Sequence, residues 1–398
     1  MALDTGVTTW LMVSALLVML MTPGVGFFYG GLVRKKNFIS MIALSFVVLA
    51  LTSIHWVLIG YSLAFGPDVG GFIGNLSYLG LNGVSANATT AAYPPLVYMV
   101  FQLFFASVTI TIVTSAVAER IKLTSFIVFV LVWLTVVYCP LAHWAWGGGW
   151  AQQMGLIDFA GGTVVEIASG FAALALALVI GKRAGFGEYS LEPHNIPIAL
   201  LGAALLWFGW FGFNAGSALA VNASAVTAFV NTNSAAAAGA LAWMCASWYH
   251  GKPSSLGMVS GAIAGMVAIT PAAGFVSPLV AILIGVVAGV LCFGMMLLRI
   301  RRQLDESLDA WAIHGMGGLW GTLATGLFAA AAVAGFSGLF EGNIHQFLVN
   351  ALGAFAAVFY AFVMTYIVAI IIDRLMGMRV TPDEEYVGLD ICQYGERA

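Results

Sequence analysis

Charge is what this sequence has least of. Only 8% of its 398 residues are Asp, Glu, Lys or Arg, and the formal net charge is −3. A soluble domain averages about 25% charged residues, so this composition excludes a soluble globular protein. So few basic residues also exclude nucleic acid as a partner. Apolar residues make up 61% of the chain, which indicates an integral membrane protein embedded in a lipid bilayer.

Cysteine pairs and catalytic motifs are also lacking. The four cysteines, Cys139, Cys245, Cys292 and Cys392, are scattered without C-x-x-C or zinc-like spacing. No P-loop, Rossmann fingerprint, zinc-protease motif or nucleophile elbow occurs in a suitable context. We therefore expect no metal, no cofactor and no enzymatic activity. The first residues lack a basic region and a small-residue cleavage site, so we expect no cleaved signal peptide.

Long apolar runs fill most of the chain. About 20 apolar residues in a helix cross the roughly 30 Å of hydrocarbon in a bilayer. Eleven such runs are predicted, at about 8–31, 39–66, 94–118, 124–146, 158–181, 195–220, 232–249, 256–276, 278–298, 308–334 and 345–373. The predicted fold class is therefore an all-α polytopic membrane protein with eleven transmembrane helices.

The basic residues predict how these helices are oriented. All 14 Lys and Arg residues fall in six clusters, and each cluster follows an odd-numbered helix. Cytoplasmic loops carry an excess of Lys and Arg. The alternation therefore predicts an N-terminus outside and a C-terminus inside, which ten or twelve helices would not produce.

An internal echo relates the two halves of the apolar sequence. The first run contains PGVGFFYGG (Pro23–Gly31) and the sixth contains WFGWFGFNAGS (Trp207–Ser217), while the fifth and tenth both carry ionisable residues. With five helices per unit, the second unit starts on the opposite side of the membrane. This is the pattern of an inverted repeat, whose substrate path lies at the repeat interface. We predict a 5+5 inverted repeat plus one extra helix.

The predicted spans divide the chain into a membrane domain and a tail. Repeat one covers about 8–181, repeat two covers about 195–334, and the extra helix covers about 345–373, all within a membrane domain at 1–380. The remaining residues, 381–398, form a short acidic tail that is too small to be a domain.

Two ionisable residues are predicted to lie near the middle of the bilayer. Glu166 lies about 12 Å into a helix that enters from outside, and His314 lies about 9 Å into one that enters from inside. An acid at the bilayer centre costs about 2.5–3.5 kcal/mol, so Glu166 should face a cavity or a partner such as His314. The two groups could share a proton in a functional site, or they could form a structural pair that seals two helices.

Asp158 and Asp309 stand where the fifth and tenth helices are predicted to begin. Asp is a favoured N-cap residue, and its charge suits the positive end of the helix dipole. We therefore expect capping as the role of both residues. Asp158 could also favour cations in an outer vestibule.

Aromatic residues and one hydroxyl fall on the outer parts of neighbouring spans. Phe105, Trp146 and Phe213 lie in the third, fourth and sixth runs, and Ser217 lies one turn beyond Phe213. Aromatic faces attract cations, and a hydroxyl supplies an acceptor. The alternative is ordinary packing or an interfacial aromatic belt, since the chain has 27 Phe and 12 Trp.

The segments around these residues, taken in sequence order, resemble those of the ammonium transporter family (Amt/Mep/Rh), and particularly its prokaryotic Amt-like branch. The resemblance covers essentially the full length. It rests on PGVGFFYGGLVRKKN, AHWAWGGGW, DFAGGTVV, WFGWFGFNAGSA, DAWAIHGMGG and EEYVGLDICQYGE.

The resemblance implies a homotrimer in which each protomer has its own pore. It implies a role for each residue singled out above: substrate recruitment for Trp146, Phe105 and Ser217, a gate for Phe105 and Phe213, a structural and electrostatic role for Asp158, and pore lining for His314. It also implies that the tail at 381–398 is a cytoplasmic regulatory segment, which in relatives contacts a PII signal protein.

One departure from the family is central. The usual first pore histidine of the family aligns with Glu166, inside GGTVVEIASG, and some fungal members are similar in carrying an acid there. A neutral pair of imidazoles offers no fixed charge. An ionised Glu166 could instead stabilise a protonated His314 or a passing cation.

The resemblance implies an energy-independent ammonium permease of the cell membrane. It would recruit ammonium at the outer aromatic site and conduct ammonia past Glu166 and His314, and methylammonium is a candidate second substrate. Two alternatives stay open: an ammonium sensor or receptor of the same fold with little or no flux, and an Rh-type neutral gas channel.

Overall fold

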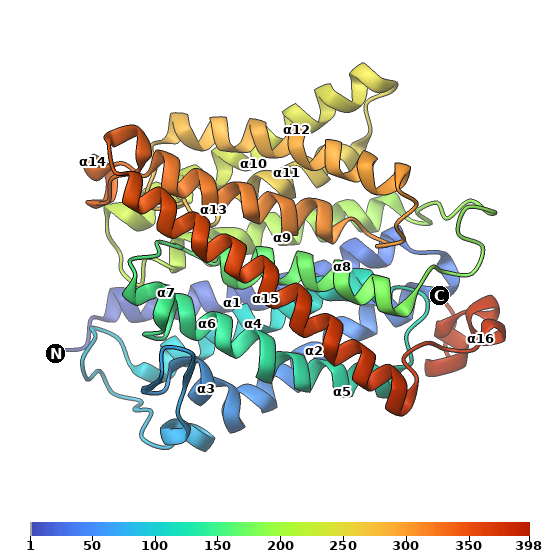
Figure 1. Cartoon of the computed structure of the whole chain (residues 1–398), viewed down its shortest axis with the longest axis horizontal. Helices are drawn as coiled ribbons and strands as arrows, with labels where there is room; N and C mark the ends of the chain where they lie inside the picture. The colour runs from blue at the N-terminus through green and yellow to red at the C-terminus, as the bar shows by residue number, and fades with distance from the viewer. Residues whose placement is uncertain (1) are drawn as a thin grey trace.

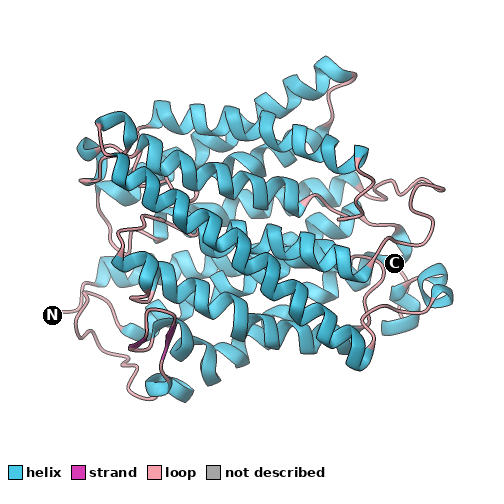
Figure 2. Cartoon of the chain, in the orientation of Figure 1, coloured by secondary structure: helices cyan, strands magenta, loops and turns pink. Residues whose placement is uncertain are grey.

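The computed structural model describes residues 2–398; residue 1, with which the predicted membrane domain begins, lies outside them. The chain is almost wholly helical, and its long helices run side by side along one direction (Figures 1 and 2). The α-helices are α1 (Thr5–Leu32), α2 (Phe38–His55), α3 (Tyr61–Phe65), α4 (Pro95–Val113), α5 (Leu123–Trp133), α6 (Cys139–Trp146), α7 (Trp150–Gln153), α8 (Ala168–Ile180), α9 (Ile196–Gly216), α10 (Ala223–His250), α11 (Ser255–Ile269), α12 (Pro278–Arg301), α13 (Met316–Phe328), α14 (Ala331–Ala334), α15 (Ile344–Met376) and α16 (Pro382–Val387).

Shorter elements interrupt or join these helices. The π-helical turns are η2 (Trp56–Gly60), η5 (Leu134–Tyr138), η6 (Gly162–Ile167), η7 (Trp311–Gly315) and η9 (Asp390–Tyr394). The 3₁₀ turns are η1 (Lys35–Asn37), η3 (Leu76–Leu81), η4 (Thr114–Val117) and η8 (Leu339–Glu341). In the loop after α3, the strands β1 (Asp68–Val69) and β2 (Ile73–Gly74) pair antiparallel, with Asp68 opposite Gly74.

The prediction of an all-helical multi-pass membrane protein is confirmed. Each predicted apolar run contains a helical segment, and among residues 2–398 eight segments are long and apolar enough to cross a membrane. The count of eleven crossing helices and their orientation stay predictions.

Two of the predicted boundaries were wrong. The seventh run was predicted to begin at about 232, but α10 begins at Ala223. The polar side chain of Asn231 is buried and donates to the carbonyls of Ala273 and Val276, so the helix continues through it. The tenth run was predicted to continue to 334, but α13 ends at Phe328. The backbone of Ala329 leaves the helical conformation, with a φ of −52° and a ψ of 133°.

The glycines in the two echoed segments let α1 and α9 pack closely. A Cβ on Gly31 would lie 2.5 Å from the backbone nitrogen of Ala199, and one on Gly212 would lie 2.6 Å from Cβ of Leu17. Since lipid tails are as apolar as the helices, close packing between small residues is what holds such helices together.

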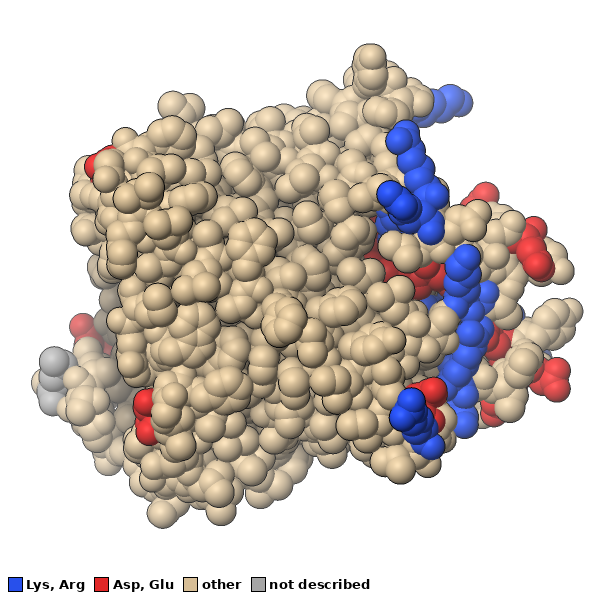
Figure 3. Space-filling view, viewed as in Figure 1, with Lys and Arg blue, Asp and Glu red and all other residues tan. Residues whose placement is uncertain are grey.

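The basic side chains gather at one end of the helix bundle, which we call the basic end (Figure 3). The N-terminus lies at the opposite end, which we call the N-terminal end (Figure 1). The face of the N-terminal end seen in Figure 3 shows acidic side chains but no Lys or Arg.

Buried ion pairs join four connections at the basic end. The carboxylate of Glu119 accepts bonds from the backbone and side-chain nitrogens of Arg34, at 2.6 and 2.7 Å. Arg183 lies 3.7 Å from Glu119 and 2.8 Å from Asp305. These residues follow α1, η4, α8 and α12, so one network ties four helix ends together.

The predicted tail folds back onto the basic end. The carboxylate of Asp390 accepts bonds from the backbone nitrogens of Ile39 and Ser40, at 3.0 and 2.7 Å, in the first turn of α2. The amide oxygen of Gln393 accepts a bond from the backbone nitrogen of Leu123, at 2.6 Å, where α5 begins. The tail therefore satisfies the free N–H groups of two distant helix starts.

Candidate functional site

Glu166 and His314 meet in the interior of the bundle. Nδ1 of His314 lies 2.7 Å from Oε2 of Glu166. His314 is 7% exposed and Glu166 is 1% exposed, so the contact is made away from bulk water. The other oxygen of Glu166, Oε1, is buried and has no hydrogen-bond partner within residues 2–398. The pair therefore keeps an acceptor for a further hydrogen-bond donor.

Both residues of the pair lie on π-helical turns. Glu166 belongs to η6, and His314 belongs to η7. Single π-turns inside α-helices occur frequently at functional sites, because the wider turn redirects a side chain. Here the two widened turns face each other and aim an acid at an imidazole.

Glycines bring the two π-turns close enough for this contact. A Cβ on Gly170 would lie 2.0 Å from the backbone nitrogen of Gly315, and one on Gly318 would lie 2.6 Å from Cβ of Glu166. Any larger residue at these places would push the two helices apart. The spacing of the pair therefore depends on the glycines predicted to allow close packing.

Asp158 caps the helix that carries Glu166. Its Oδ1 accepts bonds from the backbone nitrogens of Gly161 and Gly162, at 2.8 and 2.7 Å. Its Oδ2 accepts bonds from the backbone and hydroxyl of Thr163, at 2.8 and 2.5 Å. Asp158 is 8% exposed. Its carboxylate therefore serves the start of η6 and is not free to hold a ligand.

Asp158 also fixes an aromatic ring through its backbone. The indole nitrogen of Trp146 donates to the carbonyl oxygen of Asp158, at 3.0 Å. Asp158 thus both orders the first turn of η6 and sets the position of the Trp146 ring.

The expectation that Asp309 caps a helix was wrong. Its carboxylate lies 2.6 Å from Nε of Arg299, with which it forms an ion pair. Asp309 also adopts a φ of +64°, in the left-handed region. A second acid, Glu306, caps the helix in place of Asp309. Its Oε2 accepts a bond from the backbone nitrogen of Trp311 at the start of η7.

Glu306 is a buried residue that the sequence reasoning missed. It is fully buried, and its Oε1 accepts a bond from the hydroxyl of Ser115 at 2.7 Å. Burial and the nearby charge of Asp309 raise the pKa of Glu306. The signal that could have found it is the rarity of acids in this chain: two adjacent ones, at 305 and 306, directly precede the tenth apolar run.

Two stacked phenyl rings separate the pair from the N-terminal end. The rings of Phe105 on α4 and Phe213 on α9 lie 4.1 Å apart with an interplanar angle of 23°. Both residues are fully buried. The ring of Trp146 stands at 88° to that of Phe105, with centroids 6.1 Å apart. The sequence-predicted aromatic residues therefore do lie together.

A pocket of about 170 Å³ lies beside these rings toward the N-terminal end. We call it the recruitment pocket, after the role that the family resemblance implies for Trp146 and Ser217. Trp146 and Ser217 line it. The hydroxyl of Ser217 donates to the carbonyl of Phe213 at 2.8 Å, so its lone pairs stay available to accept a bond. The pocket thus offers a ring face and an acceptor.

Gln102 is a second polar residue that the sequence reasoning missed. It lines the recruitment pocket, is 6% exposed and donates through Nε2 to the hydroxyl of Tyr98. Its Oε1 is buried and has no hydrogen-bond partner in the described chain. An unsatisfied buried oxygen costs about 1–3 kcal/mol.

A very small cavity lies between the stacked rings and the pair. It measures about 10 Å³, which is room for about one water, and Phe213, Glu166 and His314 are among the residues that line it. Its other walls are aliphatic and aromatic side chains. A further cavity of about 280 Å³ opens at the basic end, with Ile313 and Asp309 among its lining residues. The cavity beside the pair is therefore much smaller than the cavities toward either end of the bundle.

No metal site accompanies this path. Within residues 2–398, no group of three or more His, Cys, Asp or Glu side chains is arranged to hold a metal ion.

Comparisons with known proteins point to one family. The model of the Ammonium Transporter Family matches residues 9–398. The chain is 56% identical to the ammonium transporter Amt1 of Archaeoglobus fulgidus over 394 residues, which cover 99% of each chain. Its structure is similar to the crystal structure of Candida albicans Mep2, with a TM-score of 0.91, 37% identity and coverage of 96% of this chain and 88% of the other. It is also similar to a protein described as a Sensor Amt Protein, with a TM-score of 0.91, 31% identity and coverage of 97% and 98%.

Proposed function

The chain belongs to the ammonium transporter family, and on this premise we propose that it recruits ammonium in the recruitment pocket and conducts ammonia past Glu166 and His314. It is a transporter or channel rather than an enzyme. The single observation that carries the residue roles is the order of features along the path: ring and acceptors first, then stacked phenyl rings, then a 10 Å³ cavity beside the pair.

The recruitment step is supported by the residues around the pocket. A cation over an aromatic face gains about 0.5–2 kcal/mol, depending on how far it is desolvated. The face of Trp146 supplies this attraction, and the hydroxyl of Ser217 and the amide oxygen of Gln102 supply acceptors for the N–H groups. A water-sized cation with four donors matches this combination.

The stacked rings favour passage of the neutral molecule. A cation moved into apolar surroundings without partners loses its hydration at a large cost. The cavity below Phe213 holds only about one water and is walled mostly by hydrocarbon, so it cannot hydrate an ion. Ammonium should therefore give up its proton to water on the outer side of the rings, and the neutral molecule passes them. The pair of Glu166 and His314 either relays the proton separately or tunes passage.

The experiment that tests this function is current recording on proteoliposomes with a solid-supported membrane. Wild type should give a saturable current on addition of ammonium. Trp146→Leu should weaken the apparent affinity by about 2- to 30-fold, as loss of one cation–π contact implies. The control is Trp248→Leu, which removes an exposed indole outside the path. Ammonium binding without flux would support the sensor alternative, and flux without charge movement would support a neutral gas channel.

The sensor alternative is not favoured. The relative at 56% identity is named an ammonium transporter, whereas the structure described as a sensor is 31% identical.

The arrangement in the membrane is part of this proposal. We propose that the N-terminus lies outside the cell and that the basic end lies on the cytoplasmic side of the cell membrane. All Lys and Arg residues fall in loops or helix ends that the positive-inside rule assigns to that side. The division of the chain into two repeats (about 8–181 and 195–334), an extra helix (345–373) and a tail (381–398) is part of the same proposal.

The oligomer and partner are also proposals. A homotrimer and a PII signal protein at the basic end rest on the family resemblance. The docked tail supports the PII partner, because its contacts with α2 and α5 hold it beside the loops that a cytoplasmic partner would meet.

A further inference from the structure

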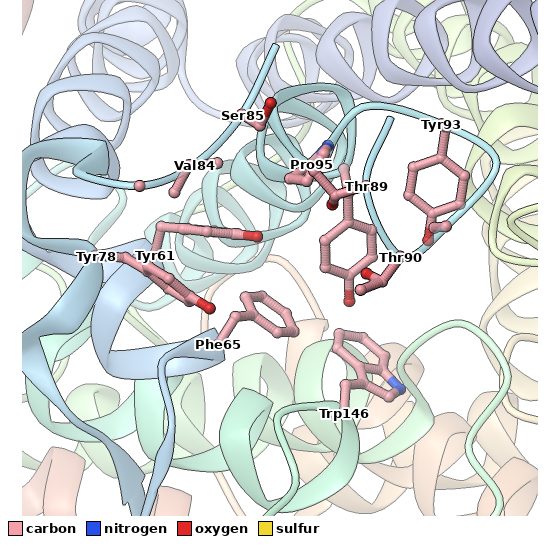
Figure 4. Close-up of a pocket in the computed structure, with 13 residues that line it drawn as sticks. Tyr61, Phe65, Tyr78, Val84, Ser85, Thr89, Thr90, Tyr93, Pro95 and Trp146 are labelled. Atoms are coloured by element: carbon pink, nitrogen blue, oxygen red, sulfur yellow. The ribbon is translucent and has the colours of Figure 1, made fainter. Parts of the chain in front are cut away.

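A cavity of about 400 Å³ opens at the N-terminal end, above the recruitment pocket. Aromatic rings surround it, and we call it the outer aromatic cup (Figure 4). The rings belong to Tyr61, Phe65, Tyr78, Tyr93, Tyr98 and Trp146. Its volume lies within the roughly 300–1,000 Å³ of sites that bind small molecules. Nothing in the recruitment or conduction of ammonium requires a cavity of this size.

Five of the six rings of the cup, all except that of Trp146, form a connected series. The ring centroids of Phe65 and Tyr98 lie 5.2 Å apart, and those of Tyr61 and Phe65 lie 5.5 Å apart. Tyr78 stands 6.0 Å from Tyr61, and Tyr93 stands 6.3 Å from Tyr98. The rings come from α3, η3, α4 and the loop before α4, so segments distant in the sequence build one wall.

Hydrogen bonds hold this wall in place. The hydroxyl of Ser62 donates to the carbonyl of Asn75 at 2.8 Å and accepts a bond from the backbone nitrogen of Tyr78 at 2.9 Å. The carbonyl of Ser85 accepts a bond from the backbone nitrogen of Leu96 at 3.1 Å. A cage whose loops are fixed before binding loses little entropy when a ligand enters.

The charge around the cup favours a cation. Among residues 2–398, no Lys, Arg, Asp or Glu lines the cavity, so its attraction for ions comes from ring faces. The loop that joins α3 to α4 (66–94) carries the acid Asp68 and no Lys or Arg, and the backbone nitrogen of Asp4 donates to the carbonyl of Ala92 in the same loop. An anion would meet unfavourable potential there, whereas a cation would meet favourable potential and six rings.

We propose that the outer aromatic cup is a binding site for a quaternary ammonium cation, represented by choline or tetramethylammonium. Such a cation has no N–H groups, so it needs ring faces rather than acceptors, and aromatic cages are the usual protein site for it. The recruitment pocket, with 170 Å³ and its unpartnered amide oxygen on Gln102, suits the bare ion instead.

A cation held in the cup does not pass through the protein. The path narrows from 400 to 170 and then to 10 Å³. The cup and the recruitment pocket share Tyr98 and Trp146, so an occupant of the cup covers the way to the pocket. Quaternary ammonium is therefore a blocker rather than a substrate; this consequence rests on the proposed function, whereas binding itself does not.

Calorimetry on the purified full-length protein tests the binding. Choline is titrated beside its uncharged carbon isostere, dimethylbutanol, which has nearly the same shape. A cage that recognises charge should bind choline at least about tenfold more tightly than the isostere. Equal affinities, or no binding of choline and tetramethylammonium, would overturn the proposal.

Substitutions locate the site. Tyr78→Leu and Tyr93→Leu should each weaken choline binding by about fivefold, since each removes one ring. Tyr78→Phe keeps the ring and should bind within about twofold of wild type, and it shows whether the position tolerates change. Tyr249→Leu, an exposed tyrosine on the last turn of α10, is the matched control. An unchanged Kd in both leucine variants would place the site elsewhere and sink the idea.

A current measurement separates this inference from the proposed function. Choline should reduce the ammonium current of wild type and should reduce it less in Tyr78→Leu. Because choline binding is measured without ammonium, a protein that binds choline but gives no current overturns the transport function alone. A protein with normal current and no choline binding overturns the cup alone.

Discussion

At the scale of single residues, Glu166 gives the path a group that a histidine in its place does not. One carboxylate oxygen is bonded to His314, and the other has no partner in the described chain. An acid held this way can receive a proton from one side while its partner holds a second proton on the other. The residue is therefore suited to move charge as well as to line a wall.

We expect Glu166→Gln to alter how the ammonium current depends on pH. The amide keeps the shape but cannot exchange a proton, so a relay through this residue would lose about 10²-fold in rate, the low end for a positioned acid–base group. The apparent affinity at the recruitment pocket should change by less than about twofold, because the stacked rings lie between the two places.

Glu166→His is the informative companion, since it installs the histidine that is usual in the family. Currents from wild type, Glu166→Gln and Glu166→His recorded across pH provide the comparison. Three identical profiles would leave Glu166 with a structural role only.

Gln102→Leu should weaken recruitment. The substitution removes the buried oxygen that has no partner within the described residues. A hydrogen bond to a charged group is worth about 1.5–3 kcal/mol, so the ammonium concentration for half-maximal current should rise at least about tenfold.

Gln152→Leu is the matched control for this effect. Gln152 also lines the recruitment pocket, but its oxygen already accepts a bond from the backbone nitrogen of Gly148. An equal effect of both substitutions would mean that the free oxygen of Gln102 is not what matters.

The sequence allowed the acid and imidazole to be predicted because ions inside apolar runs are rare and costly. The stack of Phe105 and Phe213 followed from family motifs, since nothing in the composition separates these rings from the other 25 Phe residues. Gln102 was missed because one amide in an apolar helix has no pattern, and its free oxygen is visible only once the neighbours are placed.

At the scale of elements, the contact between the two π-turns depends on glycine. A Cβ at Gly170 would meet the backbone of Gly315, which cannot move without shifting a whole helix. Gly170→Ala should therefore destabilise the protein by about 1–3 kcal/mol and reduce the current by separating Glu166 from His314.

Gly294→Ala on α12 is the control for this substitution. A Cβ there would meet nothing within 4 Å, and alanine favours a helix over glycine by about 1 kcal/mol. Thermal unfolding in detergent should show a lower Tm for the first variant and an equal or higher Tm for the second. A normal Tm for Gly170→Ala would contradict the close packing.

The helices could be predicted from the sequence, but their π-turns could not. Apolar length indicates a helix because the backbone must satisfy its own hydrogen bonds in lipid. Whether a turn widens at Glu166 or His314 depends on the helix packed against it, and the sequence of one helix does not contain that information. Asp309 illustrates the same limit: its position suggested a helix cap, but its carboxylate forms an ion pair with Arg299 instead.

At the scale of the whole molecule, the ion network at the basic end should make stability depend on pH. Burial raises the pKa of Glu119, but the charges of Arg183 and Arg34 outweigh this and hold it below its ordinary value. An acid with a lowered pKa adds stability at neutral pH. That stability is lost as the pH falls through the pKa of the folded state, below about 4.3, the usual value for Glu.

Glu119→Gln should therefore lower stability at pH 7 by about 3–5 kcal/mol, as breaking a buried pair does. The loss should shrink as the pH approaches 3, because wild type then protonates the same group. Tm measured from pH 7 to pH 3 checks this. Glu188→Gln, at an exposed acid in the loop after α8, should follow the wild-type curve, and parallel curves for all three proteins would refute the network's role.

Asp390 and Gln393 complete the first turns of α2 and α5, which begin about 350 and 270 residues earlier in the chain. Without these side chains, only water at the basic end would satisfy the same N–H groups. A cut in the chain before residue 388 would therefore free both helix starts at once while leaving every predicted membrane span whole.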